Sequence, residues 1–267
     1  EYLFYQTLVG AWPGPGDPTF ADRFRAFASK ATHEAKANTS WINPNPEYDA
    51  GVEAFVTAVL DPARSRDFLD DLAAFQARVA RVGAWNGLAQ AVVRLLAPGV
   101  PDTYQGTELW DFSMVDPDNR RPVDYARRAD LLAALDKGAD PADLVERADD
   151  GRIKLHVTAT ALRLRRDHAA LYRDGEYLPL EATGAKADHV FAFARRLGDE
   201  VAVVVVPRLV VKLAGGPDYP PVGKVWDDTT VPLHTAGGWA ERFAGERLDA
   251  EGRPRLPLAQ ALARFPV

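Results

Sequence analysis

The chain has 267 residues, and 47% of them are hydrophobic, which is enough for one large domain or two smaller ones. Its net charge of −6 and the lack of a clustered Lys/Arg stripe argue against nucleic-acid binding, which needs local positive potential. The chain has no cysteine, which excludes disulfides, thiolate metal sites and a cysteine nucleophile. We therefore expect a cytoplasmic protein whose charge remains compatible with neutral ligands.

No segment has the pattern of a membrane span or a secretory leader. The longest apolar runs, such as residues 201–206, are far too short to cross a bilayer. The sequence begins with Glu1 instead of Met, so we expect that residues upstream have been removed.

Apolar residues at helical spacing dominate the first part of the chain. They predict helices around 20–31, 52–60, 68–82 and 85–97, the last ending at Pro98-Gly99. The Pro- and Gly-rich stretch 13–18 and the stretch 38–46 are predicted loops.

A short strand is predicted at 100–104, with Gly106 allowing a sharp turn after it. Helices follow at 125–136 and 152–169. From about residue 184 the apolar period changes to two, which predicts strands at 190–196, 201–213, 231–234 and 255–258. This last region is expected to form a small antiparallel β-sandwich.

The loop 105–124 combines acidic, basic and aromatic side chains. Carboxylates and guanidinium groups can bind sugar hydroxyls, and aromatic rings can cover the apolar face of a sugar. The loop offers both kinds: Glu108, Asp116, Asp118, Arg120, Arg121 and Asp124, with Tyr104, Trp110 and Phe112 between them. A solvated surface turn is the alternative, because Asp-Pro-Asp-Asn is ordinary turn chemistry. A calcium loop is rejected, because Arg120 stands at the next ligand position and no glycine follows.

A second candidate loop contains Lys36, Thr39, Ser40, Trp41 and Asn43. A lysine beside a tryptophan can hold a sugar by hydrogen bonds and stacking. The alternative is that Trp41 packs into the core while Lys36 lies on a helix surface. The five histidines show no paired metal spacing, and no phosphate-binding loop or nucleophile elbow is present.

Four stretches carry a resemblance to a known family. Gly99, Pro101, Tyr104, Gly106 and Glu108 stand where the α-amylase superfamily reads Gly-x-Pro-x-x-Tyr-x-Gly-x-Glu, at its eighth barrel strand. Residues 2–13, 34–45 and 115–122 narrow the resemblance to the C-terminal part of the maltooligosyltrehalose synthase family. The resemblance extends over most of the chain.

The resemblance implies an α+β chain: the last strand and helices of a (β/α)8 TIM barrel within residues 1–184, then a sandwich domain at 185–267. The catalytic carboxylates of the family would all precede residue 1. The strand at 100–104 would then lack its neighbours, and helix residues Leu88, Val92 and Leu95 would leave an apolar face exposed and promote self-association. Asp167, although it imitates the nucleophile motif of the superfamily, is expected to be a surface acid near a helix end.

The implied activity is isomerisation of the reducing-end α-1,4 bond of a maltooligosaccharide to an α,α-1,1 bond, without cofactor or metal. The substrate-binding candidates are Lys36, Trp41, Tyr104, Gln105, Glu108, Trp110, Asp116, Asp118, Arg120 and Arg121. The expected partners are the glucan and the remaining, N-terminal part of the barrel. A related α-glucan hydrolase or transferase and a non-catalytic glucan-binding module remain the alternatives.

Overall fold

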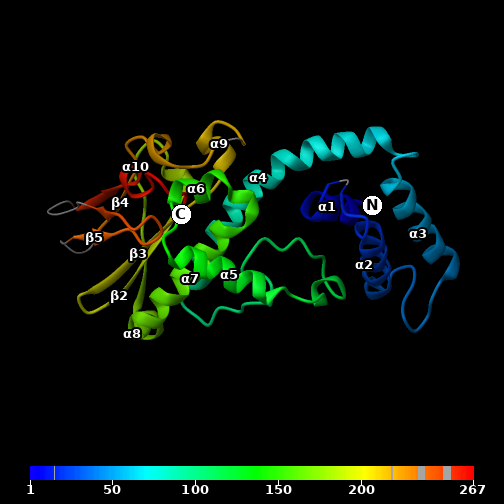
Figure 1. Ribbon diagram of the computed structural model, residues 1–267, viewed down its shortest axis with the longest axis horizontal. Helices are drawn as coiled ribbons and strands as arrows, with labels where there is room; N and C mark the ends of the chain where they lie inside the picture. Colours follow the sequence, from blue (N-terminus) through cyan, green and yellow to red (C-terminus); the bar gives the residue numbers. More distant parts are fainter. Residues whose placement is uncertain (15, 218, 234–237, 249–253) are drawn as a thin grey trace. The chain divides into compact units, whose positions relative to one another are not determined.

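The computed structural model describes residues 1–267 except 15, 218, 234–237 and 249–253 (Figure 1). Helices occupy most of the chain up to residue 174: α1 (Tyr2–Ala11), α2 (Phe20–Ala35), α3 (Pro46–Leu60), α4 (Arg66–Leu96), α5 (Tyr125–Asp136), α6 (Pro141–Glu146), α7 (Arg152–Asp167) and α8 (Ala169–Asp174). Strands and short helices follow: β1 (Glu176–Pro179), β2 (Val190–Leu197), β3 (Glu200–Pro207), α9 (Val210–Ala214), β4 (Thr230–Pro232), β5 (Trp239–Ala240), β6 (Arg247–Leu248), β7 (Arg255–Pro257) and α10 (Leu258–Ala261). The chain is thus of the α+β class, as predicted.

The chain divides into two compact units. The first comprises 1–80 and 111–123, and the second comprises 81–110 and 124–267. The predicted domain boundary between 184 and 185 is a different division and stays a prediction. Strand β1, which precedes that boundary, pairs with β2, which follows it.

Aromatic residues of α1 and α2 form the centre of the first unit. Phe20, Phe24 and Phe27 recur at helical spacing along one side of α2 and are all buried. Phe4 of α1 meets Phe24 edge to face, with 5.9 Å between the ring centroids. Met114 joins this cluster and thereby connects the loop 111–123 to the helices.

The core of the second unit lies between helices and a three-stranded antiparallel sheet of order β1-β2-β3. Its buried residues include Leu88 and Val92 of α4, Val157 of α7, and Phe193 and Val204 of the sheet. A second buried cluster, centred on Ala194, Trp226, Val231, Leu256 and Leu258, joins β2 to the two-stranded β4-β7 sheet. Consequently β2 is buried along its middle.

Several predicted elements are confirmed: the helices near 20–31 and 52–60, and the helix at 125–136, which is α5. The separate helices at 68–82 and 85–97 were a wrong prediction, because α4 is continuous. No proline interrupts it, and Gly83 alone does not end a helix. The helix predicted over 152–169 ends at Asp167, and α8 begins at Ala169 after the non-helical His168.

The strand predicted at 201–213 is too long. It ends at Pro207, and Leu209 then takes a left-handed conformation (φ 53°) that starts α9. Proline explains the stop, because it has no N–H to donate to a sheet. The strands predicted at 231–234 and 255–258 correspond to β4 and β7. His234 lies outside the described residues, and Leu258 begins α10.

Of the two expectations about exposed segments, the one for residues 100–104 is confirmed and the one for the apolar face of α4 is wrong. Residues 100–104 form no strand with any described part of the chain, and Val100 is 97% exposed. The apolar face of Leu88, Val92 and Leu95, however, is not exposed at all, so that prediction was wrong. Helix α7 and the sheet of the same chain pack against it, which removes this face as a reason for self-association.

Candidate functional site

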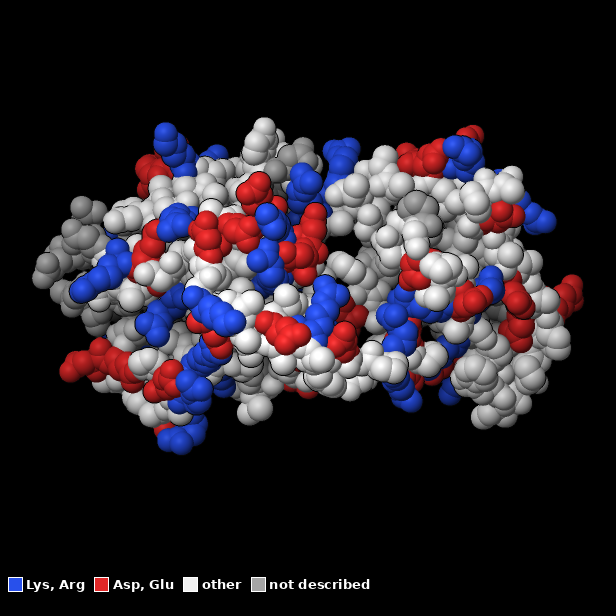
Figure 2. All heavy atoms as spheres, viewed as in Figure 1, with Lys and Arg blue, Asp and Glu red and all other residues white. Residues whose placement is uncertain are grey.

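The ten candidate residues fall in both units, and each set is described by itself. The first unit holds Lys36, Trp41, Asp116, Asp118, Arg120 and Arg121, and the second holds Tyr104, Gln105, Glu108 and Trp110. On the face drawn in Figure 2, basic and acidic side chains are interspersed, and no extended basic stripe is visible.

Asp118 is a buried anchor between the loop 111–123 and helix α2. Its carboxylate accepts two hydrogen bonds from Arg23, Nε to Oδ1 at 2.7 Å and Nη2 to Oδ2 at 2.9 Å. The N–H of Met114 donates to Oδ2 at 2.8 Å, and Arg121 Nε lies 3.0 Å from Oδ1. With 6% of its surface exposed, Asp118 is surrounded by protein donors.

The pair of Asp118 and Arg23 is ionised at neutral pH. Burial on its own would raise the pKa of Asp118, but hydrogen bonds from Arg23 and from the Met114 N–H lower it below its usual value. The hydrogen bond to Asp118 in turn raises the pKa of Arg23. Asp118 therefore holds the loop in place through a charged, bidentate contact.

Arg120 is presented to solvent next to this anchor. It lies on a short 3-10 helix (Asp118–Arg120) and forms an ion pair with Asp116, yet 69% of its side chain is exposed. Lys30 of α2 approaches the other oxygen of Asp116 at 3.5 Å. Asp116 is thus neutralised by two cations, while the guanidinium of Arg120 remains accessible to a ligand.

Trp41 is an exposed aromatic platform. Its ring stacks on His33, with centroids 4.2 Å apart and planes inclined by 19°, and 62% of the residue is exposed. His33 is itself fixed, because Nδ1 lies 2.7 Å from the carbonyl oxygen of Ser29 and Nε2 lies 3.4 Å from Asp49. The alternative that Trp41 packs into the core is therefore wrong.

The loop that carries Trp41 is held by its own polar residues. Thr39 is buried; its hydroxyl donates to Asp49 at 3.2 Å and accepts the N–H of Asn45 at 3.0 Å. Ser40 and Asn43 close a turn, and Lys36 ends α2 in a left-handed conformation (φ 54°) with an exposed side chain. The loop therefore presents Lys36 and Trp41 outward.

In the second unit, Arg128 of α5 clamps the motif that contains Glu108. Its Nε donates to the Glu108 carboxylate at 3.0 Å, its Nη2 to the carbonyl oxygen of Gly106 at 2.7 Å, and its Nη1 to that of Asp124 at 3.1 Å. Gly106 has φ 86°, the region that glycine occupies without strain. Glu108 is thereby committed to a protein partner.

Trp110 packs into the second unit. Its indole N–H donates to the carbonyl oxygen of Ala148 at 2.6 Å, Lys154 Nζ lies 5.4 Å from the ring centroid, and Gly87 of α4 faces the ring. Tyr104 is 45% exposed and Gln105 is exposed, so these two remain accessible.

Three other residues singled out in the sequence lie at the start of a helix, at the surface or at the end of a helix. Asp124 caps α5 by accepting the N–H of Arg127 at 2.9 Å, and Phe112 is 55% exposed. Asp167 lies at the end of α7 and pairs with Arg166, with 52% of its side chain exposed, as predicted. Among the described residues, no group of three His, Cys or acidic side chains could hold a metal, and no helix is long and apolar enough to cross a membrane.

Sequence reasoning missed His33, Arg23 and Arg128, which hold the candidate residues in place. No motif marks them. The one available signal was the placement of Phe20, Phe24 and Phe27 on the buried side of α2, which leaves Arg23 beside the core.

No family model matches the chain. It is, however, 38% identical over 268 residues to a Mycobacterium tuberculosis protein described provisionally as a maltooligosyl trehalose synthase. The alignment covers 99% of this chain and 30% of that protein. The chain is thus similar in sequence to one part of the proteins described as maltooligosyltrehalose synthases.

Comparison with solved structures gives the same family as the sequence comparison. The maltooligosyltrehalose synthase of Arthrobacter ramosus matches with a TM-score of 0.76 and 36% identity, over 99% of this chain and 31% of that one. A protein of Sulfolobus tokodaii, described as a hypothetical maltooligosyl trehalose synthase, matches with a TM-score of 0.65 and 25% identity, over 96% and 30%. The chain thus spans about a third of the length of its relatives.

Proposed function

We propose that the chain is the C-terminal part of a maltooligosyltrehalose synthase. The parent enzyme would convert the reducing-end α-1,4 bond of a maltooligosaccharide to an α,α-1,1 bond by intramolecular transglucosylation, without a cofactor. The observation that carries this proposal is the similarity to these synthases over nearly the whole chain, at about 30% of their length.

The fold supports a place at the end of a barrel enzyme. Residues 100–104, the expected eighth strand, are exposed and pair with no described strand, as expected of a strand whose neighbours belong to another segment. Helix α7 would be the eighth barrel helix. The sheets on both sides of the Ala194–Trp226 cluster are consistent with a terminal sandwich.

The candidate residues would bind or position substrate and perform no bond cleavage. Retaining chemistry needs two carboxyl groups roughly 5 to 5.5 Å apart that flank the reacting bond. Glu108 and Asp118 are instead engaged by Arg128 and Arg23. The nucleophile and the general acid would therefore come from the N-terminal part of the barrel, the expected partner of this chain.

We assign direct sugar contact to the accessible candidates and a positioning role to the others. Lys36, Trp41, Tyr104, Gln105 and Arg120 would contact the glucan, while Glu108, Trp110, Asp116, Asp118 and Arg121 would hold the loops. A stacked tryptophan and a guanidinium suit the two surfaces of a glucose unit. By retaining the freed glucose, they would favour rearrangement over hydrolysis.

The test is a comparison of Trp41→Ala with Ile42→Ala in the parent enzyme. Ile42 is the next residue and is 93% exposed, so its loss controls for surface truncation. We expect Trp41→Ala to lower kcat/KM for maltopentaose isomerisation about tenfold or more and to raise the hydrolysed fraction. A nucleic-acid base stacked on an aromatic side chain contributes on the order of 1–3 kcal/mol, and we take the same order for a sugar ring. Equal kinetics in the two variants would contradict the assignment of Trp41.

Two assays separate this proposal from the alternatives: maltopentaose binding by the isolated chain, and product analysis of the parent enzyme. A non-catalytic glucan-binding module should bind maltopentaose fully without the remaining two thirds of the protein. A related hydrolase or transferase should show products other than trehalose-ended glucans when the parent is assayed.

A further inference from the structure

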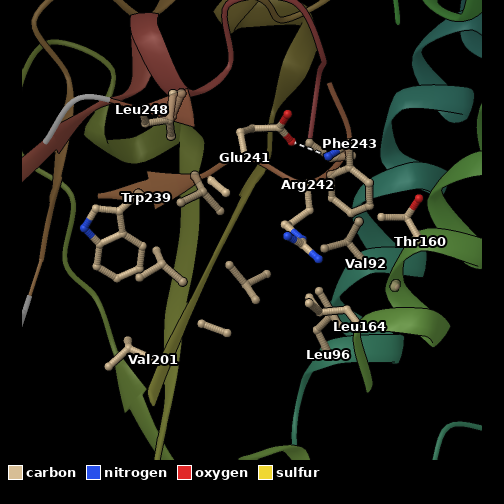
Figure 3. Close-up of a pocket in the computed structure, with 18 of the residues that line it drawn as sticks. Val92, Leu96, Thr160, Leu164, Val201, Trp239, Glu241, Arg242, Phe243 and Leu248 are labelled. Atoms are coloured by element: carbon tan, nitrogen blue, oxygen red, sulfur yellow. Dashed lines mark hydrogen bonds between the residues drawn. The ribbon is translucent and has the colours of Figure 1, made fainter. Parts of the chain in front are cut away.

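A cavity of about 300 Å³ lies within the second unit (Figure 3). Its walls come from helices α4, α7 and α8, strand β3, the segment 238–243 that includes β5, and residues near α10. None of the ten candidate sugar-binding residues lines it. The cavity is therefore distinct from the surfaces assigned above.

Most of the wall is aliphatic. Val92 and Leu96 of α4, Leu164 of α7, and Val201 of β3 surround the open space in Figure 3. While such a pocket is unfilled, its apolar lining atoms lack packing partners on one side. Water is a poor occupant, because it needs two to four polar partners. A glucose unit is also a poor match, because hydroxyl groups surround its ring and aliphatic walls satisfy none of them.

The lining also contains hydrogen-bond donors and a positive charge. Arg242 points into the cavity in Figure 3. Tyr172, also in the lining, is only 3% exposed, and its hydroxyl has no hydrogen-bond partner in the described part of the chain. Arg165 and Arg195 lie over its ring, at 5.5 and 5.9 Å from the centroid. Burial raises the pKa of Tyr172 to about 12, so its hydroxyl stays protonated and able to donate.

The acidic residues of the lining already have partners. The Glu200 carboxylate lies within hydrogen-bond distance of His168 Nδ1. The Glu241 carboxylate accepts the N–H of Phe243 at 2.6 Å and that of Ala244, and it points away from the cavity in Figure 3. Burial raises the pKa of Glu241, although the backbone N–H groups of Phe243 and Ala244 act in the opposite direction. Arg242 is an exposed residue whose guanidinium points into the cavity, so an anionic ligand can reach it.

We propose that this cavity binds an aliphatic carboxylate of medium chain length. The hydrocarbon chain lies against the valine and leucine walls, and the carboxylate accepts hydrogen bonds from Arg242 and Tyr172. The volume fits roughly ten non-hydrogen atoms at about 30 Å³ each, the share of a water molecule in the liquid. Octanoate has that size. This site does not depend on the proposed isomerase activity.

The probe is octanoate, titrated into the 267-residue chain by isothermal titration calorimetry. We expect saturable binding at one site, with a negative heat-capacity change from burial of the alkyl chain. Octanol, butyrate and maltotriose are the comparison ligands. Octanol lacks the charge, butyrate lacks the chain length, and maltotriose lacks the apolar body, so all three should bind more weakly.

Variants that remove one polar group each test which side chains bind the carboxylate of octanoate. Arg242→Gln should weaken octanoate binding about ten- to a hundredfold, because a hydrogen bond between charged groups is lost, and leave octanol binding unchanged. Tyr172→Phe should weaken octanoate binding less. Arg247→Gln is the matched control, because Arg247 lies on β6 and is exposed but does not line the cavity. Circular dichroism confirms folding of each variant.

Three results would overturn the proposal: no saturable octanoate binding to the unaltered chain, equal losses in Arg242→Gln and Arg247→Gln, or displacement of octanoate by maltotriose. Tyr172→Phe keeps the ring and its packing, so it remains informative if Arg242→Gln does not fold. Failure of trehalose formation in the parent enzyme would leave this binding result unaffected.

Discussion

Arg23 and Asp118 are separated by 95 positions in the chain and joined by two hydrogen bonds of 2.7 and 2.9 Å. This contact attaches the acidic and basic loop 111–123 to helix α2. The same helix carries Lys30, which faces Asp116, and His33, which supports Trp41. Both candidate loops of the first unit are thus organised by one helix.

Breaking this pair should destabilise the first unit. Arg23→Met leaves the Asp118 carboxylate buried with fewer donors, and removal of one partner of a buried ion pair costs about 3 kcal/mol. Urea unfolding should show that loss. Arg25→Met is the control, because Arg25 pairs with a mostly exposed Asp22 and its loss should cost less than about 1 kcal/mol. Equal midpoints for the two variants would contradict the anchor role.

The anchor should also give the stability a pH dependence. Because the pKa of Asp118 in the folded state lies below the ordinary value of 3.8, its ionised form contributes stability above pH 3.8. This contribution is lost as the pH falls further, through the folded-state pKa. Urea midpoints measured from pH 6 to pH 2.5 should therefore fall less steeply below pH 4 in Asp118→Asn than in the unaltered chain. Parallel curves would exclude Asp118 as a contributor.

The helices and the motifs could be predicted from the sequence, but the contacts between them could not. Helix α2 could be predicted from Phe20, Phe24 and Phe27, because the helical spacing of apolar residues is visible within a short stretch of sequence. The burial of Leu88 was missed because the sheet that covers it lies a hundred residues later in the chain. In the same way, the contact between Glu108 and Arg128 could not be predicted, because Arg128 stands on a helix with no motif. Long-range pairing of this kind leaves no local pattern.

Loss of the Arg128 clamp should loosen the motif loop locally. Arg128→Ala removes three donors to residues 106, 108 and 124, so amide hydrogen exchange at 104–110 should become at least tenfold faster, equivalent to about 1.4 kcal/mol. Arg127→Ala is the control on the same helix, because only its backbone N–H bonds to Asp124. Arg128→Lys should recover part of the protection. Unchanged exchange in Arg128→Ala would show that the loop is held by other contacts.

Arg120 should matter for activity and little for folding. In the parent enzyme, Arg120→Ala should lower kcat/KM for maltopentaose about ten- to a hundredfold, because a charged hydrogen bond contributes roughly 1.5 to 3 kcal/mol. Its unfolding midpoint should hardly change, because 69% of the side chain is exposed. Arg64→Ala, whose side chain is 71% exposed, is the matched control in the same unit. Unchanged kinetics in Arg120→Ala would return this loop to the class of solvated turns.

The 267-residue chain alone should form no maltooligosyltrehalose from maltopentaose. Its motif carboxylates are engaged, Asp118 by Arg23 and Glu108 by Arg128, so they are poorly placed to act as nucleophile and acid. Chromatographic assay of long incubations against a protein-free control checks this. Addition of a separately produced N-terminal part of the parent should restore product, and restoration should be weaker with Trp41→Ala than with Ile42→Ala. Product from the chain alone would show that it contains the reacting carboxylates and would overturn the division of roles proposed here.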